Sequence, residues 1–439
     1  MIKTAAARLE RLLTFVYLVI FAGIFWPPDG YFERPGPRIG SYSNIYDFMM
    51  FVSLIAFLAI VTAARWRDML RLLRVAWPIL VLTGFAFVSA FWSDDPGLVI
   101  RRAGTVSATA LFAVHLVARS DPDEFIALLV KVYAVGMFAS LAMILISKRL
   151  AISGNETYVS AWRGAFTDKN TLGLACALAL IIAFYAFRAR LGPRWLAALT
   201  IAAALVLLKL SESKTPVVVM AAAVYAAAIA NALRRRSRAG LATGFTLTVV
   251  GLAGAALIAL FLQDALALLG RDSTFTNRAK IWHYALVYIA KRPWLGYGYG
   301  AFWRNDGVEA NQFWALVEFH TPHAHNAWLE LGLGVGIVGL GLIALTWLAG
   351  LYRVFRVLTA PAARHVSFCL ALMAGIFVEN LTEYEFFRPG DILWVLFVAV
   401  IVYLGRARQL DLETRRAEKA ARRLGTRMPI PAAAHQASA

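Results

Sequence analysis

The residues best suited to chemistry stand together just before a long apolar run. In the stretch "HTPHAHNAWLELGLGVGIVGLG" (320–341), the residues His320, His323, His325 and Asn326 precede the apolar part. A neutral imidazole can take a proton from an attacking hydroxyl, and the His323-x-His325 spacing could instead hold a metal ion. The sequence supplies no second cluster of carboxylates or thiolates for a defined metal geometry, which favours chemistry without a metal. A purely structural role for His325 at a helix start also stays open.

Cationic and amide side chains recur beside other apolar runs. They are Arg101, Arg102, Arg163, Lys169, Asn170, Lys214 and Arg278. The planar guanidinium of arginine binds phosphate through two parallel hydrogen bonds and keeps its charge at physiological pH. A diphosphate leaving group needs several such contacts if no divalent ion assists. Together with a histidine base, the cations predict glycosyl transfer from a polyprenyl-diphosphate-linked sugar to a hydroxyl.

Each of these cations also has a structural alternative. Arg101 and Arg102 could extend to lipid headgroups, and Lys214 could belong only to a tight turn. Arg163 and Arg278 could pair with carboxylates and support the fold. Because charges near bilayer depth are costly, a functional role is the first hypothesis for them.

The composition is that of a membrane protein. Of the 439 residues, 60% are hydrophobic and 16% are charged, whereas soluble domains are roughly 45–50% apolar and 25% charged. Contact with anionic lipid headgroups accounts for the net charge of +18, and no nucleic-acid partner is expected. Both cysteines, Cys176 and Cys369, fall inside apolar runs and predict no disulfide. No cofactor is expected.

The fold class predicted by the apolar pattern is an all-α integral membrane protein with about 12 transmembrane helices, since a helix needs about 20 apolar residues to cross a bilayer. The candidate spans are 12–26, 44–63, 75–92, 98–118, 125–147, 170–187, 195–210, 216–232, 242–262, 326–350, 366–382 and 391–405.

Arginine and lysine collect in alternate connectors between these spans, as the excess of positive charge on cytoplasmic loops requires. Both termini are therefore expected in the cytoplasm. We expect a polytopic membrane domain over 1–405 and a basic, partly disordered tail over 406–439. The longest outer connector covers 263–325. Within it, an amphipathic helix at the outer interface is expected to begin near Asn277 and to end before Pro293.

Four stretches together resemble the O-antigen ligase-like superfamily, which includes O-antigen ligases and the polymerases of O-antigen and exopolysaccharide. The similar stretches are "RGAFTDKNTLG" (163–173), "SESKT" (211–215), the segment 277–303, and "HN" (325–326) with "GIVG" (336–339). The first has the form seen in exopolysaccharide polymerases of the ExoQ type. Two residues depart from the family pattern, because Asn277 replaces a common Gly and Asp168 replaces a common His or Ser.

The resemblance implies a membrane glycosyltransferase fold built from helices, an active site in an outer cavity covered by the long loop, and catalysis without a metal. It implies that Arg163 and Arg278 bind the donor diphosphate and that His325 is the catalytic base. Further substrate contacts are expected from Lys169, Asn170, Arg101, Arg102, Lys214, His323 and Asn326. The glycines within 332–341 are expected to let neighbouring helices pack closely.

The favoured function is polymerisation or ligation of a polyprenyl-diphosphate-linked oligosaccharide on the periplasmic face of the bacterial inner membrane, in surface polysaccharide biosynthesis. The acceptor would be a glycan for a polymerase, or the lipid A core of lipopolysaccharide for a ligase. Membrane lipids are expected partners, and a chain-length regulator or export proteins are further candidates. The alternative is a transporter of polysaccharide or lipid-linked sugar. That class predicts a repeat between the chain halves and charges near mid-membrane, and the sequence shows neither.

Overall fold

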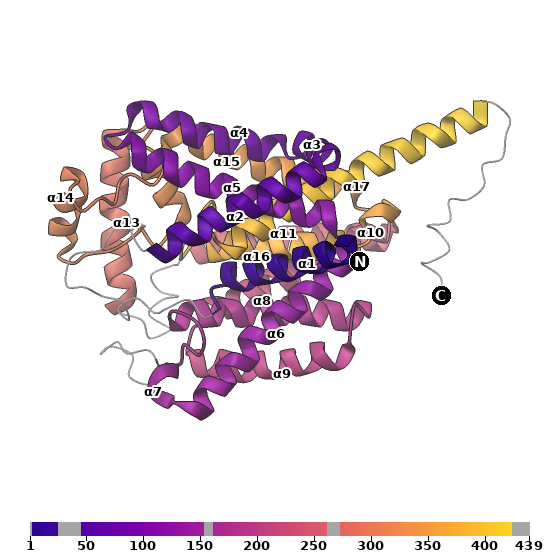
Figure 1. The fold of residues 1–439 in the computed structure, drawn as a ribbon, viewed down its shortest axis with the longest axis horizontal. Helices are drawn as coiled ribbons and strands as arrows, with labels where there is room; N and C mark the ends of the chain where they lie inside the picture. Colours follow the sequence, from indigo (N-terminus) through magenta and orange to yellow (C-terminus); the bar gives the residue numbers. More distant parts are fainter. Residues whose placement is uncertain (1, 25–44, 153–160, 261–272, 424–439) are drawn as a thin grey trace.

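The computed structural model describes residues 2–24, 45–152, 161–260 and 273–423 of the chain. Every regular element within these ranges is a helix, and they contain one isolated extended bridge, between Ile152 and Trp162. Most of the long helices run side by side along the long axis of the molecule (Figure 1). The expected all-α integral membrane fold is confirmed.

Each of the twelve predicted spans coincides with a helix. The helices are α1 (Ile2–Phe21), α2 (Ile45–Ala64), α4 (Trp77–Val88) with the 3₁₀ turn η1 (Ser89–Trp92), α5 (Pro96–Arg119), α6 (Pro122–Ile146), α8 (Lys169–Ala189), α9 (Arg194–Ser211), α10 (Thr215–Arg234), α11 (Arg238–Leu260), α15 (Ala327–Val357), α16 (Val366–Glu379) and α17 (Ile392–Arg423). Residues 25–26 and 261–262, at the ends of two predicted spans, lie outside the described ranges.

Length and composition decide which helices could cross a membrane alone. Seven of the described helices pass this test, and α2 with the short α3 (Trp66–Val75), bent by 104°, would make an eighth span. The segment Trp77–Trp92 and α16 are apolar but shorter. The multi-pass architecture is therefore confirmed, whereas the number of twelve spans stays a prediction.

The helices of the long outer connector gather at one end of the bundle. They are α13 (Ser273–Lys291) and α14 (Val308–Val317), whereas α1 begins and α17 ends towards the opposite end (Figure 1). As the sequence predicts, α13 ends just before Pro293. Residues 261–272 of this connector lie outside the described ranges. The predicted boundary at 405–406 falls inside α17, which continues to Arg423.

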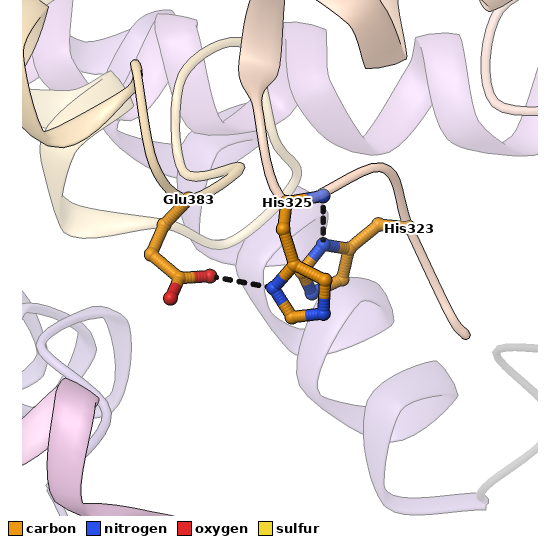
Figure 2. A group of neighbouring side chains, drawn as sticks. All are labelled: His323, His325 and Glu383. Carbon is orange, nitrogen blue, oxygen red and sulfur yellow. Dashed lines mark hydrogen bonds and ion pairs between the residues drawn. The ribbon is translucent and has the colours of Figure 1, made fainter. Parts of the chain in front are cut away.

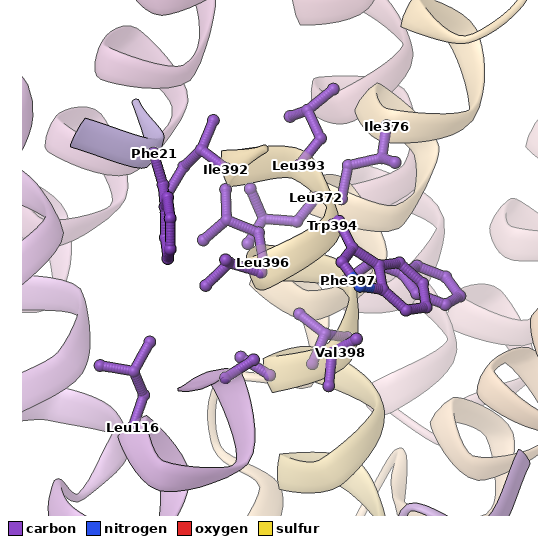
Figure 3. Packing of buried hydrophobic residues seen from close by; sticks show 14 of the residues in the cluster. Phe21, Leu116, Leu372, Ile376, Ile392, Leu393, Trp394, Leu396, Phe397 and Val398 are labelled. Carbon is purple, nitrogen blue, oxygen red and sulfur yellow. The ribbon is translucent and has the colours of Figure 1, made fainter. Parts of the chain in front are cut away.

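The centre of the bundle is α17. Every residue from Leu393 to Val402 is at most 5% exposed, so all sides of this stretch are buried. Figure 3 shows Trp394 and Phe397 packed among apolar side chains that include Leu372. A helix that is apolar all round belongs in a core and not at a surface. This packing fixes where α17 begins, and it thereby fixes the connector 380–391 that leads into it.

The helix α15 is broken inside the bundle. Gly336 has φ 61° and ψ −167°, which no α-helix contains, so one helix ends before it and another begins after it. The backbone amides of Ile337 and Val338 donate instead to the carbonyls of Pro293 and Trp294, at 2.8 and 3.1 Å. Non-helical backbone inside a membrane protein is tolerated where other protein groups satisfy its hydrogen bonds.

The "GYGYG" loop (296–300) packs on the first half of α15. A Cβ on Gly296 would lie 2.6 Å from the carbonyl oxygen of Leu333, and a Cβ on Gly334 would lie 3.4 Å from the amide nitrogen of Gly300. The glycines of α15 therefore do allow close packing, and here the close neighbour is a loop. Gly336 has a different task, because the break needs its positive φ.

We predict that Gly336→Ala destabilises the protein by at least about 2 kcal/mol. A non-glycine residue at such a φ costs about 1–3 kcal/mol, and the new Cβ would meet the carbonyl oxygen of Trp294 at 2.4 Å. Gly341→Ala is the matched control, since a Cβ there has no atom within 4 Å. Thermal unfolding of the purified protein in detergent measures both. Equal unfolding temperatures for the two variants would contradict the role given to Gly336.

Candidate active site

A short turn ahead of α15 carries His325 and Asn326. Asn326 is the N-cap of the helix, and its Oδ1 accepts hydrogen bonds from the backbone amides of Trp328 and Leu329 at 2.9 and 3.1 Å. Its Nδ2 donates to the carbonyl of Leu381 at 2.9 Å, which ties the helix start to the connector between α16 and α17. Asn326 therefore supports the turn, and its contact with a substrate stays a prediction.

The site converges on Glu383, which lies in that connector. Its Oε2 is 3.0 Å from Nδ1 of His325 (Figure 2), and its Oε1 is 2.6 Å from Nη2 of Arg278. Arg278 also donates through Nη1 to the carbonyl of Thr382 at 2.8 Å. The side chains of Glu383 and Arg278 are 13% and 14% exposed. One carboxylate thus holds the predicted base and a predicted phosphate-binding cation at fixed positions.

The charge on Glu383 sets the tautomer of His325. Burial by itself would raise the pKa of Glu383, but the hydrogen bond with His325 and the charge of Arg278 lower it to about 2. An ionised carboxylate only accepts hydrogen bonds, so Nδ1 of His325 carries a proton, and in the neutral form of the ring the lone pair lies on Nε2. Within the described part of the chain, no residue hydrogen-bonds Nε2, and the side chain is 28% exposed. Nε2 is therefore available as a base.

Two further motifs reach the same carboxylate. Asn170 donates through Nδ2 to Oε1 of Glu383 at 3.4 Å, and Ser213 donates through Oγ to Oδ1 of Asn170 at 3.2 Å. Asp168 caps α8, because its Oδ1 accepts from the amides of Asn170 and Thr171 at 2.7 and 3.0 Å. The departure from the family pattern at Asp168 thus supplies a capping side chain that positions Asn170.

His323 packs against the proposed base. The ring centroids of His323 and His325 are 4.2 Å apart, and Nδ1 of His323 accepts from the backbone amide of His325 at 3.1 Å. Burial lowers the pKa of His323 well below its ordinary value. His320 is exposed, and its ring packs on Trp314. The three histidines therefore have three different surroundings.

A buried carboxylate beneath the turn holds its shape. Glu330 is 7% exposed, and it accepts from the amide of Ala324 at 2.9 Å and from Nε1 of Trp303 at 2.8 and 2.9 Å. Nε1 of Trp282 donates to the carbonyl of Ala324 at 3.1 Å. Both backbone groups of Ala324 are thereby fixed, and Ala324 lies directly before His325 in the chain.

Half of the predicted site residues lie at this turn or around Glu383. The others lie near or shortly before the beginnings of neighbouring helices. Those at the turn or around Glu383 are His323, His325, Asn326, Asn170 and Arg278. The others are Arg101 and Arg102 in α5, Arg163 and Lys169 at α8, and Lys214 before α10. Arg102 donates to the carbonyl of Gly300, and Nη1 of Arg163 lies 3.5 Å from the carbonyl oxygen of Thr167. Their contacts with a substrate stay predictions.

The same turn offers a donor set for a metal. One atom each from His323, His325 and Glu383 lies within 4.8 Å of the other two, and two imidazoles with one carboxylate suit Zn²⁺. The guanidinium of Arg278, 2.6 Å from Glu383, already neutralises that carboxylate. A second cation beside it would be repelled, and this favours metal-free chemistry.

Sequence reasoning gave no role to Glu383 or Glu330. Glu383 is one of several charged residues in the connector between α16 and α17, and this clustering was the only signal for it in the sequence. Glu330 lies in the first turn of α15, where a carboxylate among apolar residues was the signal. The alternative in which Arg278 pairs with a carboxylate is the arrangement that the structure contains.

The chain is similar to known proteins over this region. The family model described as O-antigen ligase matches residues 196–344. The exopolysaccharide production protein ExoQ of Rhizobium meliloti (strain 1021) is 27% identical over 335 residues, which cover 71% of this chain and 73% of the relative. Both comparisons support the resemblance to the O-antigen ligase-like superfamily. They support a role for this multi-pass membrane protein in polysaccharide biosynthesis, through a glycosyltransferase-like polymerase or ligase activity on lipid-linked oligosaccharide.

We predict that Glu383→Gln lowers the transfer rate about 10²–10⁴-fold, the range that a positioned base contributes, because an amide no longer enforces the proton on Nδ1 of His325. Glu385→Gln is the matched control, since it breaks a more exposed pair with Arg388 in the same connector. The measurement is the initial rate of glycan transfer at equal protein abundance. A wild-type rate in Glu383→Gln would contradict the role of Glu383 in holding the proton on Nδ1 of His325.

The same variant should change the acid sensitivity of the fold. The pKa of Glu383 is lowered from 4.5 to about 2, so its stabilising contribution is complete above pH 4.5 and is lost as the pH falls towards 2. Thermal unfolding between pH 7 and pH 3 should therefore depend less on pH in Glu383→Gln than in the wild type.

Proposed function

We propose that the protein transfers a glycan from polyprenyl diphosphate to an acceptor hydroxyl at the outer face of the bacterial inner membrane, without a metal ion. The observation that supports this most directly is the contact of Nδ1 of His325 with an ionised Glu383, which directs the lone pair of the neutral ring to Nε2. The similarity to an exopolysaccharide production protein, together with the ExoQ-type form of the stretch 163–173, favours a polymerase with a glycan acceptor. The ligase alternative would use the lipid A core.

In the proposed reaction, Nε2 of His325 takes the proton of the acceptor hydroxyl as its oxygen attacks the anomeric carbon of the donor sugar. The bond from that carbon to the diphosphate oxygen breaks, and polyprenyl diphosphate leaves with the electron pair. The histidine becomes an imidazolium, which the carboxylate of Glu383 stabilises at 3.0 Å. Glu383 itself does not gain the proton, because its pKa is too low.

Arg278 can serve both Glu383 and the leaving group. A guanidinium has five N–H donors, and the contacts with Glu383 and with the carbonyl of Thr382 account for two of them. The remaining donors are compatible with a diphosphate oxygen. Arg163, in the segment before α8, is the second cation assigned to the diphosphate. Developing negative charge on the leaving group would meet these fixed positive charges, which stabilises the transition state.

The orientation in the membrane is part of the proposal. Positive charge in alternate connectors assigns both termini to the cytoplasm, and α1 begins towards the bundle end opposite α13 and α14 (Figure 1). The turn before α15 and the connector with Glu383 would then face the periplasm, where polymerisation or ligation of lipid-linked glycans takes place in this proposal.

We predict that His325→Ala lowers transfer about 10²–10⁴-fold and causes lipid-linked donor to accumulate, while the protein stays folded. His320→Ala should be mild because His320 is exposed and packs only on Trp314 among the described rings. His323→Ala should be intermediate because it removes the acceptor for the amide of His325.

A metal site makes different predictions for the same experiment. His323 and His325 would then be equally essential, and EDTA would abolish activity of the purified wild type. The assay is in vitro transfer by all three histidine variants and the wild type, with and without EDTA. Full activity in His325→Ala, or complete loss in EDTA, would overturn the proposed mechanism.

We predict that Arg278→Ala is more harmful than Arg163→Ala. Each loses a charge-assisted bond to phosphate, worth roughly 1.5–3 kcal/mol or about 10- to 150-fold in rate, but Arg278→Ala also releases Glu383. Arg278→Lys should rescue only in part, because an ammonium cannot bind two oxygens in parallel.

A double-mutant comparison separates the two arginines. The double variant Arg278→Ala with Glu383→Gln should lose less transition-state stabilisation than the sum of the two single variants, because both changes disrupt one contact. Arg163→Ala combined with Glu383→Gln should be nearly additive. If both arginine variants kept wild-type glycan formation at matched abundance, the diphosphate assignment would be wrong.

A further inference from the structure

A cavity of about 170 Å³ lies at the other end of the bundle from Glu383. It is walled by the end of α5, the beginnings of α6 and α16, and the middle of α17, and its lining includes His365. His365 directly precedes α16, whereas Glu383 follows the end of that helix. The length of α16 therefore separates this cavity from the proposed active site, which makes the cavity a separate feature of the protein.

The lining of the cavity changes from polar to apolar along its length. Its polar members include His365, which directly precedes α16, and Arg406, which lies inside α17. Leu372 on α16 and Ala399 on α17 lie about two turns deeper, roughly 10 Å at the rise of an α-helix, and both also line the cavity. The helices α16 and α17 run in opposite directions. His365 and Arg406 therefore lie at one depth in the cavity, and Leu372 and Ala399 lie at another. The cavity is therefore amphiphilic.

The charged residues that line the cavity are Arg406 and Asp121. Arg406 is exposed and donates through Nη1 to the carbonyl of Val117 at 3.0 Å, and no carboxylate of the described chain pairs with it. The nearby acidic groups are engaged elsewhere. Asp121 accepts from the amide of Glu124 at 2.9 Å, and Asp123 bonds His365 and the guanidinium of Arg364. The remaining N–H groups of Arg406 thus stay available to a phosphate oxygen beside the apolar cavity, while Asp121 in the same lining carries the opposite charge.

We infer that this cavity binds one acyl chain of an anionic phospholipid, whose phosphate contacts Arg406. A multi-pass protein is surrounded by such molecules, and the volume is well above the roughly 10–15 Å³ that a cavity needs to hold one water molecule. Arginine near the membrane surface attracts anionic headgroups by about 1 kcal/mol each. The inference does not depend on the reaction proposed for His325.

The test uses the full chain reconstituted with phosphatidylcholine and phosphatidylglycerol and then exchanged into mild detergent. Native mass spectrometry counts the lipids retained by each protein molecule. The wild type should retain phosphatidylglycerol over phosphatidylcholine. Arg406→Gln should weaken that retention about fivefold, which corresponds to the attraction of one arginine near the surface. Arg408→Gln is the matched control on the same helix, because its guanidinium stacks on Tyr352 of α15 instead.

A second pair of variants tests the apolar part. Cys369 lines the cavity, so Cys369→Phe should fill it and expel the chain, whereas Leu370→Phe, whose residue does not line the cavity, should not. If Cys369→Phe does not fold, the two arginine variants decide. Equal retention of both lipids, an equal loss in Arg406→Gln and Arg408→Gln, or a retained polyprenyl chain in place of phospholipid would overturn the inference.

Discussion

The arrangement of the site depends on one carboxylate that binds a histidine through one oxygen and an arginine through the other. Glu383 is 3.0 Å from Nδ1 of His325 and 2.6 Å from Nη2 of Arg278. Because the group is largely buried, removing either partner would leave charge without compensation, which is costly in such surroundings. The pair of contacts therefore fixes both the distance between the proposed base and the cation and which ring nitrogen of His325 faces the carboxylate.

Further hydrogen bonds near the turn hold Glu383 and its partners in position. The cap by Asn326 joins α15 to the connector of Glu383, and Glu330 fixes the backbone ahead of His325. The break at Gly336 lets the backbone after α13 complete the hydrogen bonds of α15. The segment after α13 and the helix α15 are thus packed against each other. The site residues are held mainly by helices, which position side chains more precisely than loops do.

The sequence allowed the positions of the helices to be predicted because lipid demands long apolar segments with internally satisfied backbones. It also located Asn170, Arg278 and His325, since polar residues that flank apolar runs are few. It could not show that Glu383 joins them, because that contact spans 58 positions from His325 and no local pattern encodes it. Gly336 was one of five glycines in a short stretch, and the sign of φ cannot be read from composition. Hence it was interpreted as packing alone.

The burial of α17 has a consequence for how the protein is made. Helices of a polytopic protein are synthesised from the N-terminus onward, so α17 reaches the membrane after all the helices that enclose it. The stretch from Leu393 to Val402 is at most 5% exposed. The earlier helices must therefore leave a gap for it, and the bundle closes only when translation is nearly complete. Glu383 arrives at the same late moment. A nascent chain consequently carries His325 and Arg278 without their shared carboxylate until α16 and α17 are inserted. The proposed active site is therefore complete only when the bundle has closed.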